Sequence, residues 1–354
     1  MPKINLNHDG RRTLGLVSRK AISTPSMDWI KTECLTPGAA GPLVISPAFD
    51  GVNLMTWAEK NKGFIEDSLL KRGGILFRGF SFEQVDQFEP FAKLLSPQLL
   101  EYRERSSPRH LVKGNIYTST EYPASERIFL HNENSYQQVW PMKVYFFCVT
   151  PAQTGGETPI ADIRRVLQAL SPETIARFKA EQCRYVRNFD EKLGLSWQTV
   201  FQTQDRAVVE QYCRDSEISF EWKNDGRLKT SSIRPAVTVH PHTGEPIWFN
   251  HVAFFHVSTL DPAIRDALLA TVGEDDLPAN TYYGDGSPIE PAILDEIRHA
   301  YGQATFPVPW KKGDILMLDN MLMAHGRAPY TGPRKILVAL AEPFGLLPTN
   351  VQTG

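Results

Sequence analysis

The sequence has little cysteine, no long apolar run and almost no net charge. Its 354 residues include four cysteines, at positions 34, 148, 183 and 213, and no two have the spacing of a zinc knuckle. A chain of this length can bury a core without disulfide bonds, so we expect reduced thiols and a cytoplasmic protein. The net charge of −2 offers no field that would attract nucleic acid or an acidic membrane surface.

Signals for a membrane or for export are also missing. No segment approaches the roughly 20 consecutive apolar residues of a membrane span. Residues 1–15 lack the apolar run of a secretory signal. With 42% hydrophobic and 22% charged residues, the composition is typical of a soluble globular enzyme. We therefore expect no nucleic-acid or membrane partner, and leave open whether the protein is a homo-oligomer.

Short strand-like runs, separated by Gly and Pro turns and interrupted by helices, fill much of the chain. A parallel α/β sheet would need a regular alternation of strands and helices, which this sequence lacks. The pattern predicts a mixed, β-rich fold with a double-stranded β-helix (jelly-roll) core and flanking and inserted helices, as one domain over residues 1–354. Strands are expected at 75–80, 143–150, 158–161, 236–240, 246–250, 314–319, 322–325 and 334–341.

Apolar residues at helical spacing predict a helix over Leu54–Arg72 and a second over Phe82–Leu95, with Ser81 as its N-cap. Residues 162–215 are mostly helical in character, and we expect an insertion that covers the barrel and contributes a lid. Residues 1–45 are polar and turn-rich, which predicts an N-terminal arm packed on the surface. Further helices are expected at 261–272 and 290–301.

One short stretch, residues 129–136, places a histidine and a carboxylate two residues apart. His131 and Glu133 would share one face of an extended strand. One more histidine would complete the 2-His-1-carboxylate face that holds non-haem Fe(II), and His325, after an apolar strand, is the candidate. An isolated His-x-Glu pair is also common on strand surfaces, so the spacing alone does not decide between the two interpretations.

Two further residues suggest an anion site beside these ligands. Arg334 opens an apolar strand nine residues after His325, and a buried arginine is costly unless an anion pairs with it. Its planar guanidinium suits a carboxylate. Thr158 follows a Gly-Gly turn, and its hydroxyl can add a hydrogen bond to the same carboxylate. The alternatives are an exposed arginine at a strand start and an ordinary β-branched strand residue.

Together these motifs resemble the TauD/TfdA family of Fe(II)- and 2-oxoglutarate-dependent oxygenases. Within the family they are most similar to the branch typified by the syringomycin-biosynthesis protein SyrP. The resemblance implies that His131, Glu133 and His325 are the catalytic iron ligands, and that Thr158 and Arg334 hold the distal carboxylate of 2-oxoglutarate. The motifs that carry it are Pro108-Arg109, residues 117–122, residues 131–136, Gly155-Gly156-Glu157-Thr158, Trp248-Phe249-Asn250 and the run from His325 to Arg334.

The resemblance also implies an activity. With Fe(II), 2-oxoglutarate as cosubstrate and O2, the protein would hydroxylate an unactivated C–H bond in specialised metabolite biosynthesis. The substrate would be an amino-acid-derived small molecule or an aminoacyl group tethered to a carrier protein. Glu133 stands where many relatives have Asp, as in the clavaminate-synthase-like subset, and argues against halogenation. Val338 stands where some relatives carry a second arginine that grips the substrate, and the substrate residues expected here are Arg327, Asn250 and Tyr117.

Other interpretations stay open from the sequence. The same cofactors support desaturation, epoxidation or cyclisation. A metal-free barrel could act as a binding module, and a cupin-like metal enzyme would need no cosubstrate. His240, His242, His251 and His256 could form a second metal site, although a hairpin with turn histidines is the favoured interpretation because no third ligand stands nearby in a recognisable frame.

Overall fold

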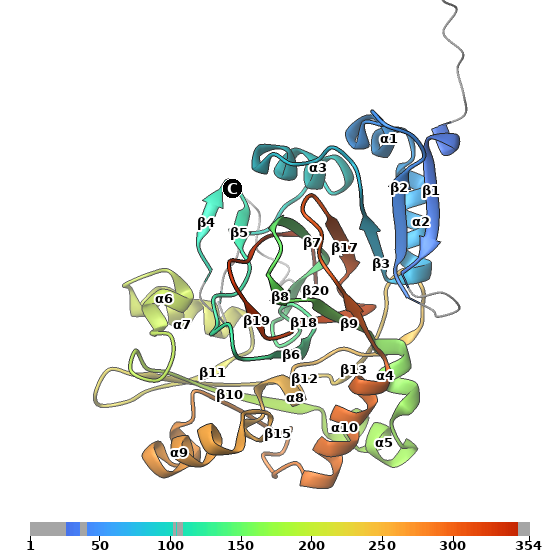
Figure 1. Ribbon diagram of the computed structural model, residues 1–354. Helices are drawn as coiled ribbons and strands as arrows, with labels where there is room; N and C mark the ends of the chain where they lie inside the picture. Colours follow the sequence, from blue (N-terminus) through green and yellow to red (C-terminus); the bar gives the residue numbers. More distant parts are fainter. Residues whose placement is uncertain (1–25, 36–40, 102–103, 105–108, 346–354) are drawn as a thin grey trace, which may run out of the picture.

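A large and a small β-sheet lie at the centre of the molecule (Figure 1). They share one buried layer of apolar side chains. The computed structural model describes residues 26–35, 41–101, 104 and 109–345. Within these residues, the larger sheet has, in spatial order, β1 (Ile30–Cys34), β2 (Leu43–Pro47), β3 (Gly74–Phe77), β17 (Ile315–Asp319), β7 (Val139–Thr150), β20 (Lys335–Gly345), β5 (Ile116–Thr118) and β4 (Leu111–Lys113). The smaller sheet has β16 (Thr305–Val308), β9 (Thr158–Asp162), β18 (Met323–Arg327) and β6 (Ile128–His131).

The remaining elements surround these two sheets. A third sheet contains β11 (Ser219–Trp222), β12 (Leu228–Arg234), β10 (Cys183–Phe189) and β15 (Ala279–Tyr283). Two strand pairs join β13 (Val237–Val239) to β14 (Pro246–Trp248) and β19 (Tyr330–Thr331) to β8 (Thr154–Gly155). The α-helices are α1 (Leu54–Lys60), α2 (Lys62–Arg72), α3 (Phe88–Leu95), α4 (Ile163–Ala169), α5 (Pro172–Glu181), α6 (Trp197–Phe201), α7 (Arg206–Asp215), α8 (Val252–Phe255), α9 (Pro262–Val272) and α10 (Pro291–Gln303). None of the described helices is long and apolar enough to cross a membrane.

Successive side chains of β18 point alternately to the inner and the outer face of the small sheet. Met323 joins the layer between the two sheets, whereas Ala324 joins the cluster on the outer face of the small sheet. Leu130 of β6 packs in that same outer cluster. Because successive side chains of a strand point to opposite faces, His131 and His325 face the layer between the sheets. Burying a side chain such as Leu130 contributes about 2 kcal/mol, which holds this orientation.

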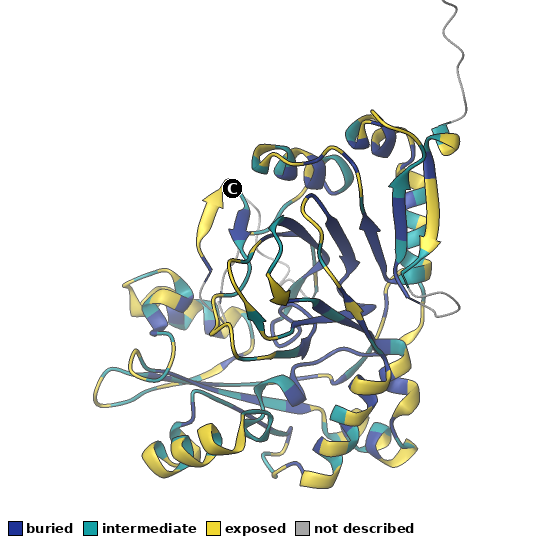
Figure 2. Cartoon of the chain, in the orientation of Figure 1, coloured by how far each residue is buried: buried dark blue, intermediate teal, exposed yellow. Residues whose placement is uncertain are grey.

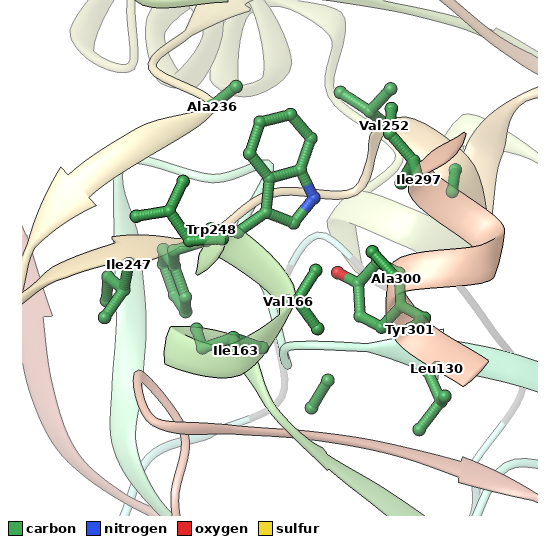
Figure 3. Close-up of a cluster of buried hydrophobic side chains, with 14 of the residues drawn as sticks. Leu130, Ile163, Val166, Ala236, Ile247, Trp248, Val252, Ile297, Ala300 and Tyr301 are labelled. Atoms are coloured by element: carbon green, nitrogen blue, oxygen red, sulfur yellow. The ribbon is translucent and has the colours of Figure 1, made fainter. Parts of the chain in front are cut away.

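Helices cover the outer faces of both sheets and have buried residues on one side and exposed residues on the other (Figure 2). The large sheet packs against α1, α2 and α3 through a cluster that includes Trp57, Leu69 and Phe88. The small sheet packs against α4, α8 and α10, where Trp248 lies between Ile247 and helical side chains (Figure 3). The β-rich fold with added helices predicted from the sequence is confirmed at this level.

Two predicted helices have different limits in the structure. The helix predicted over residues 54–72 is two helices, because the side chain of Asn61 bonds the Trp57 carbonyl at 2.7 Å and ends α1. The helix predicted from Phe82 begins only at Phe88, so Ser81 is not its N-cap. Pro90 explains the late start, since proline is tolerated in the first turn of a helix but not in its interior.

Strands also appear where none was predicted. Within the predicted arm, 1–45, the described residues include β1 and β2, which extend the large sheet and bury Val44 and Ile45. Within the predicted helical insertion, 162–215, the strand β10 separates α5 from α6. The strand predicted over 236–240 is shorter in the structure, where β13 covers Val237–Val239. The lid role of 162–215 stays a prediction.

Candidate metal and cosubstrate site

Two histidines meet across neighbouring strands of the small sheet. In the antiparallel pair of β6 and β18, His131 lies opposite His325, and their ring centroids are 4.6 Å apart. The register shifts just after this pair, at Gly326. A Cβ at Gly326 would lie 2.6 Å from the carbonyl oxygen of Ile128, so only glycine allows this close approach. The sheet itself therefore sets the spacing of the two imidazoles.

Glu133 reaches the histidines from a turn and not from a strand. The strand β6 ends at His131, and Asn134, in the left-handed region with φ 57°, follows Glu133. Asn320, in the loop between β17 and β18, accepts a hydrogen bond from the Glu133 amide at 2.7 Å and donates one to its carbonyl at 2.9 Å. His131 and Glu133 therefore do not share one face of a strand, as the sequence predicted. A turn held by Asn320 brings Glu133 to the histidines instead.

Replacing Asn320 with alanine should loosen this turn. The side chain also donates to the Pro141 carbonyl at 2.8 Å, so three hydrogen bonds of a fully buried residue would be lost. Leaving buried polar groups unpaired should cost about 3 kcal/mol of stability. Since the turn orients a candidate ligand, affinity for Mn(II) should also fall by roughly 10- to 100-fold.

Thermal unfolding and Mn(II) titration would measure the two effects. Asn188→Ala is the matched control, because buried Asn188 donates to the carbonyls of Asp275 and Leu277 and not to Glu133. The control should lose stability and keep its metal affinity. Equal metal affinity in the two variants would contradict a role of Asn320 in positioning Glu133.

The three candidate ligands form a buried group with the correct donor chemistry. His131, Glu133 and His325 place one ligand atom each within 4.8 Å of the others. Burial and the neighbouring His325 lower the pKa of His131 to about 3, so its imidazole is neutral, the form that binds metals. Its Nδ1 lies 2.9 Å from the Phe129 carbonyl, which leaves Nε2 for a metal. Two imidazoles and one carboxylate fit Fe(II) with open positions.

Arg109 contacts Glu133, the candidate carboxylate ligand. The sequence did not predict Arg109 as a site residue. Arg109 Nη2 lies 2.9 Å from Glu133 Oε2, and both side chains are almost fully buried. Burial alone would raise the pKa of Glu133, but Arg109 and His325 together hold it below its ordinary value. The motif Pro108-Arg109 was one sign of the family resemblance, yet no spacing rule connects Arg109 to a turn 24 residues downstream.

Arg334 and Thr158 lie in the same narrow cavity as the two histidines. Arg334 Nε donates to the Gly156 carbonyl at 3.0 Å, and among the described residues no carboxylate forms an ion pair with this arginine. Burial and the nearby Arg327 lower its pKa to about 10, so an anion is needed to balance its charge. The cavity is lined by Arg109, Ser119, Thr120, Ile128, His131, Phe146, Thr158, His325, Gly326, Arg327, Arg334 and Ile336.

Trp310 orients the hydroxyl of Thr158, a contact that no sequence signal indicated. The indole Nε1 donates to Thr158 Oγ1 at 3.0 Å, so the threonine proton can be donated to another acceptor. The neighbouring Gly156 has φ 73°, and a Cβ there would lie 3.2 Å from Arg334 Cδ. The turn therefore brings the backbone close to the arginine. A carboxylate in this cavity could receive hydrogen bonds from both Thr158 and Arg334.

The three residues expected to bind substrate occupy different places. Arg327 lines the narrow cavity, but its guanidinium donates to the carbonyls of Tyr122, Pro123 and Glu126. Asn250 is buried and bonds the backbone of Ala236 and Val252, at the start of α8. Tyr117 packs on β5 in the layer between the sheets. Neither Asn250 nor Tyr117 lines the narrow cavity or the larger one described below, and substrate binding by the three stays a prediction.

The remaining histidines do not assemble a second centre in the described part of the chain. His240 Nε2 lies 3.0 Å from Asp319 Oδ2, and its Nδ1 accepts from the amides of His242 and Thr243. That arrangement fits the favoured interpretation of a hairpin histidine. His251 is buried with Nδ1 2.6 Å from Ser135 Oγ, and its ring lies 5.6 Å from that of His131.

A larger cavity of about 440 Å³ adjoins the ligand group. Phe254, one of its lining residues, packs against the His131 imidazole in a tilted arrangement with ring centroids 4.4 Å apart. Thr120 and Ile128 line both cavities, so the two spaces meet beside His131. The larger cavity is otherwise lined by Tyr122, Arg127, Phe129, Arg187, Asn188, Phe189, Leu193, Gly194, Leu195, Phe255, Thr259, Leu260, Pro278 and Ala279.

Comparison with known proteins adds evidence independent of this geometry. A family model described as taurine catabolism dioxygenase TauD, TfdA family matches residues 32–340. The dapdiamide synthesis protein DdaC of Enterobacter agglomerans is 43% identical over 279 residues, covering 79% of this chain and 85% of DdaC. A clavaminate synthase-like protein of Arabidopsis thaliana is 28% identical over 319 residues, covering 85% of this chain and 93% of that protein.

Among solved structures, PvcB of Pseudomonas aeruginosa has a similar fold. Its TM-score is 0.54 at 15% identity, and the alignment covers 90% of this chain and 92% of PvcB. Another structure of PvcB is described as an Fe, alpha-ketoglutarate dependent oxygenase from an isonitrile synthetic pathway. At this identity the likeness concerns the fold alone.

Proposed function

Because the chain belongs to the taurine catabolism dioxygenase TauD, TfdA family, we propose that it hydroxylates an unactivated C–H bond of an amino-acid-derived substrate. The family predicted from the sequence motifs is confirmed. The protein is an enzyme, a 2-oxoglutarate-dependent non-haem iron oxygenase that uses Fe(II), 2-oxoglutarate and O2. This membership sets aside the metal-free binding module.

The observation that supports the assignment of residues is the buried group of His131, Glu133 and His325 beside an arginine that lacks a carboxylate partner among the described residues. In this proposal the three residues hold Fe(II). Arg334 and Thr158 bind the distal carboxylate of 2-oxoglutarate, and the two central sheets form the family's jelly-roll core. Bound iron and 2-oxoglutarate supply O2 activation, with 2-oxoglutarate converted to succinate and CO2 as the substrate is oxidised.

The larger cavity is the proposed substrate site. Its volume of about 440 Å³ lies in the usual range of small-molecule pockets, roughly 300–1,000 Å³. Aromatic and aliphatic side chains line most of it, and the contact of Phe254 with His131 brings the cavity beside the proposed iron. These residues exclude water and hold an apolar substrate portion near the metal. The exposed Arg127 can bind an anionic group of the substrate.

The name of one relative supports a biosynthetic role. DdaC is a dapdiamide synthesis protein, so we propose specialised metabolite biosynthesis for this chain. Two forms of substrate fit the cavity. One is a free amino-acid derivative, and the other is an aminoacyl group that a carrier protein presents to the cavity.

Product analysis tests the proposed reaction. The iron-loaded enzyme, with 2-oxoglutarate and O2, would be given amino acids, their amide-linked derivatives and aminoacyl groups on a carrier protein. A substrate should stimulate succinate formation and gain 16 Da on a saturated carbon. A product lighter by 2 Da would support desaturation or cyclisation instead, and a gain of 16 Da on an alkene would support epoxidation. Substrate oxidation that proceeds without 2-oxoglutarate would contradict the proposal.

A further inference from the structure

Arg109 and Glu133 form a buried ion pair at the point where the metal is expected. Their side chains are only 4% and 3% exposed, and Nη2 lies 2.9 Å from Oε2. The same oxygen lies 3.6 Å from His325 Nε2. Oε2 is therefore the carboxylate oxygen that faces the histidines, and it is the atom best placed to bind a metal.

A metal ion and the Arg109 guanidinium would compete for this oxygen. A first-row divalent metal binds a carboxylate oxygen at about 2.0–2.2 Å, closer than the arginine nitrogen. Both cations would then lie against one oxygen in a buried setting, where water screens their repulsion poorly. Binding of the metal should therefore weaken or break the contact between Arg109 and Glu133.

The narrow cavity offers Arg109 a second partner. Arg109 lines this cavity together with Thr158 and Arg334, the residues proposed for the distal carboxylate of 2-oxoglutarate. The cosubstrate is a dianion, and its other carboxylate must lie on the metal side of the cavity. A displaced guanidinium can pair with that carboxylate through charge-assisted hydrogen bonds.

We propose that Arg109 is a positioning residue that pairs with Glu133 before metal binding and transfers to the metal-side carboxylate of 2-oxoglutarate afterwards. The proposal rests on the proposed metal site and adds a coupling between the two ligands. Arg109 opposes metal binding when it acts alone, and 2-oxoglutarate relieves this opposition by giving Arg109 a new partner. Linkage requires the same coupling in both directions, so the metal should tighten 2-oxoglutarate binding equally.

Mn(II) titration with and without 2-oxoglutarate tests the coupling without turnover. In Arg109→Gln, Mn(II) alone should bind roughly tenfold tighter than in wild type, because the competing cation is absent. The factor by which 2-oxoglutarate tightens Mn(II) binding should fall by at least about fivefold. Arg109→Lys keeps a positive charge and should lie between the two, which also covers the case of a poorly folded glutamine variant.

Thermal unfolding provides a second readout. Arg187→Gln is the control for the loss of a buried arginine–glutamate pair. Arg187 pairs with Glu104 at 3.3 Å, another buried arginine–glutamate pair whose carboxylate is not a candidate ligand. This control should lose stability and keep wild-type Mn(II) affinity and coupling. Arg109→Gln should lose stability without metal, and saturating Mn(II) should close most of the gap to wild type.

Two results would overturn the proposal, and they can be told apart. Weaker Mn(II) binding in Arg109→Gln with unchanged 2-oxoglutarate coupling would show that Arg109 supports Glu133 in every state. Absence of Mn(II) binding in wild type would reject the metal site itself, and with it the proposed function.

Discussion

Replacing Glu133 with alanine is expected to abolish turnover and to lower Mn(II) affinity by at least about 100-fold. The substitution removes one of the three candidate ligands, and no other carboxylate belongs to this buried group in the described part of the chain. It also removes the carboxylate that pairs with the buried Arg109 at 2.9 Å. Breaking a buried pair in this way should cost about 3–5 kcal/mol of stability, so activity and folding must be measured separately.

Glu133→Gln separates the two effects because it keeps the shape of the side chain and removes its charge. Its unfolding temperature and its Mn(II) affinity should be compared with those of Glu121→Ala, which removes an exposed carboxylate elsewhere on the surface. The control should behave as wild type. A Glu133→Gln variant that folds, binds Mn(II) normally and retains full turnover would contradict the assignment of Glu133 as a ligand.

Replacing Arg334 with alanine should raise the KM for 2-oxoglutarate by roughly 100-fold. Charge-assisted hydrogen bonds contribute about 1.5–3 kcal/mol each, and 1.4 kcal/mol corresponds to a factor of ten. Since Arg334 is not a metal ligand, Mn(II) affinity without cosubstrate should stay within about twofold of wild type. Most of kcat should return at saturating 2-oxoglutarate.

Steady-state kinetics over a range of 2-oxoglutarate concentrations would measure the effect. Arg334→Lys restores the charge without the planar fork and should recover part of the affinity. Arg78→Ala removes an arginine paired with Asp314 at 2.6 Å and is the control for a lost cation. An unchanged KM in Arg334→Ala would place the distal carboxylate elsewhere.

The meeting of the three candidate ligands was predictable because local sequence carries most of the information for it. His131 lies at the end of an apolar run, and His325 follows another, so strand signals and the His-x-Glu pair were visible together. The turn that brings the Glu133 side chain to the histidines was not predictable. Its position depends on Asn320, which is 187 residues away along the chain and reaches Glu133 only after the sheets have formed. The contact of Arg109 with Glu133 likewise forms only through tertiary packing.

The errors in the fold have equally specific causes. The strand β1 presents mostly exposed, polar side chains at the edge of the large sheet, so its sequence has no apolar pattern. In β10, Cys183, Tyr185 and Arg187 alternate inward, a period-2 signal that the helical character of the surrounding residues obscured. Pro90 lies in the first turn of α3. Since proline is tolerated there and not in a helix interior, it indicates a helix start near Phe88 and not at Phe82.

The most direct test of the account is anaerobic titration of the purified protein with Fe(II) and then 2-oxoglutarate, followed by visible absorption. The account predicts the weak charge-transfer band of an Fe(II)–2-oxo acid chelate in wild type and its loss in His131→Ala. Circular dichroism of the variant should confirm that it remains folded. If iron binds to wild type and no band forms on addition of 2-oxoglutarate, the proposed cosubstrate site is contradicted. A metal enzyme that needs no cosubstrate would then be the better explanation of this centre.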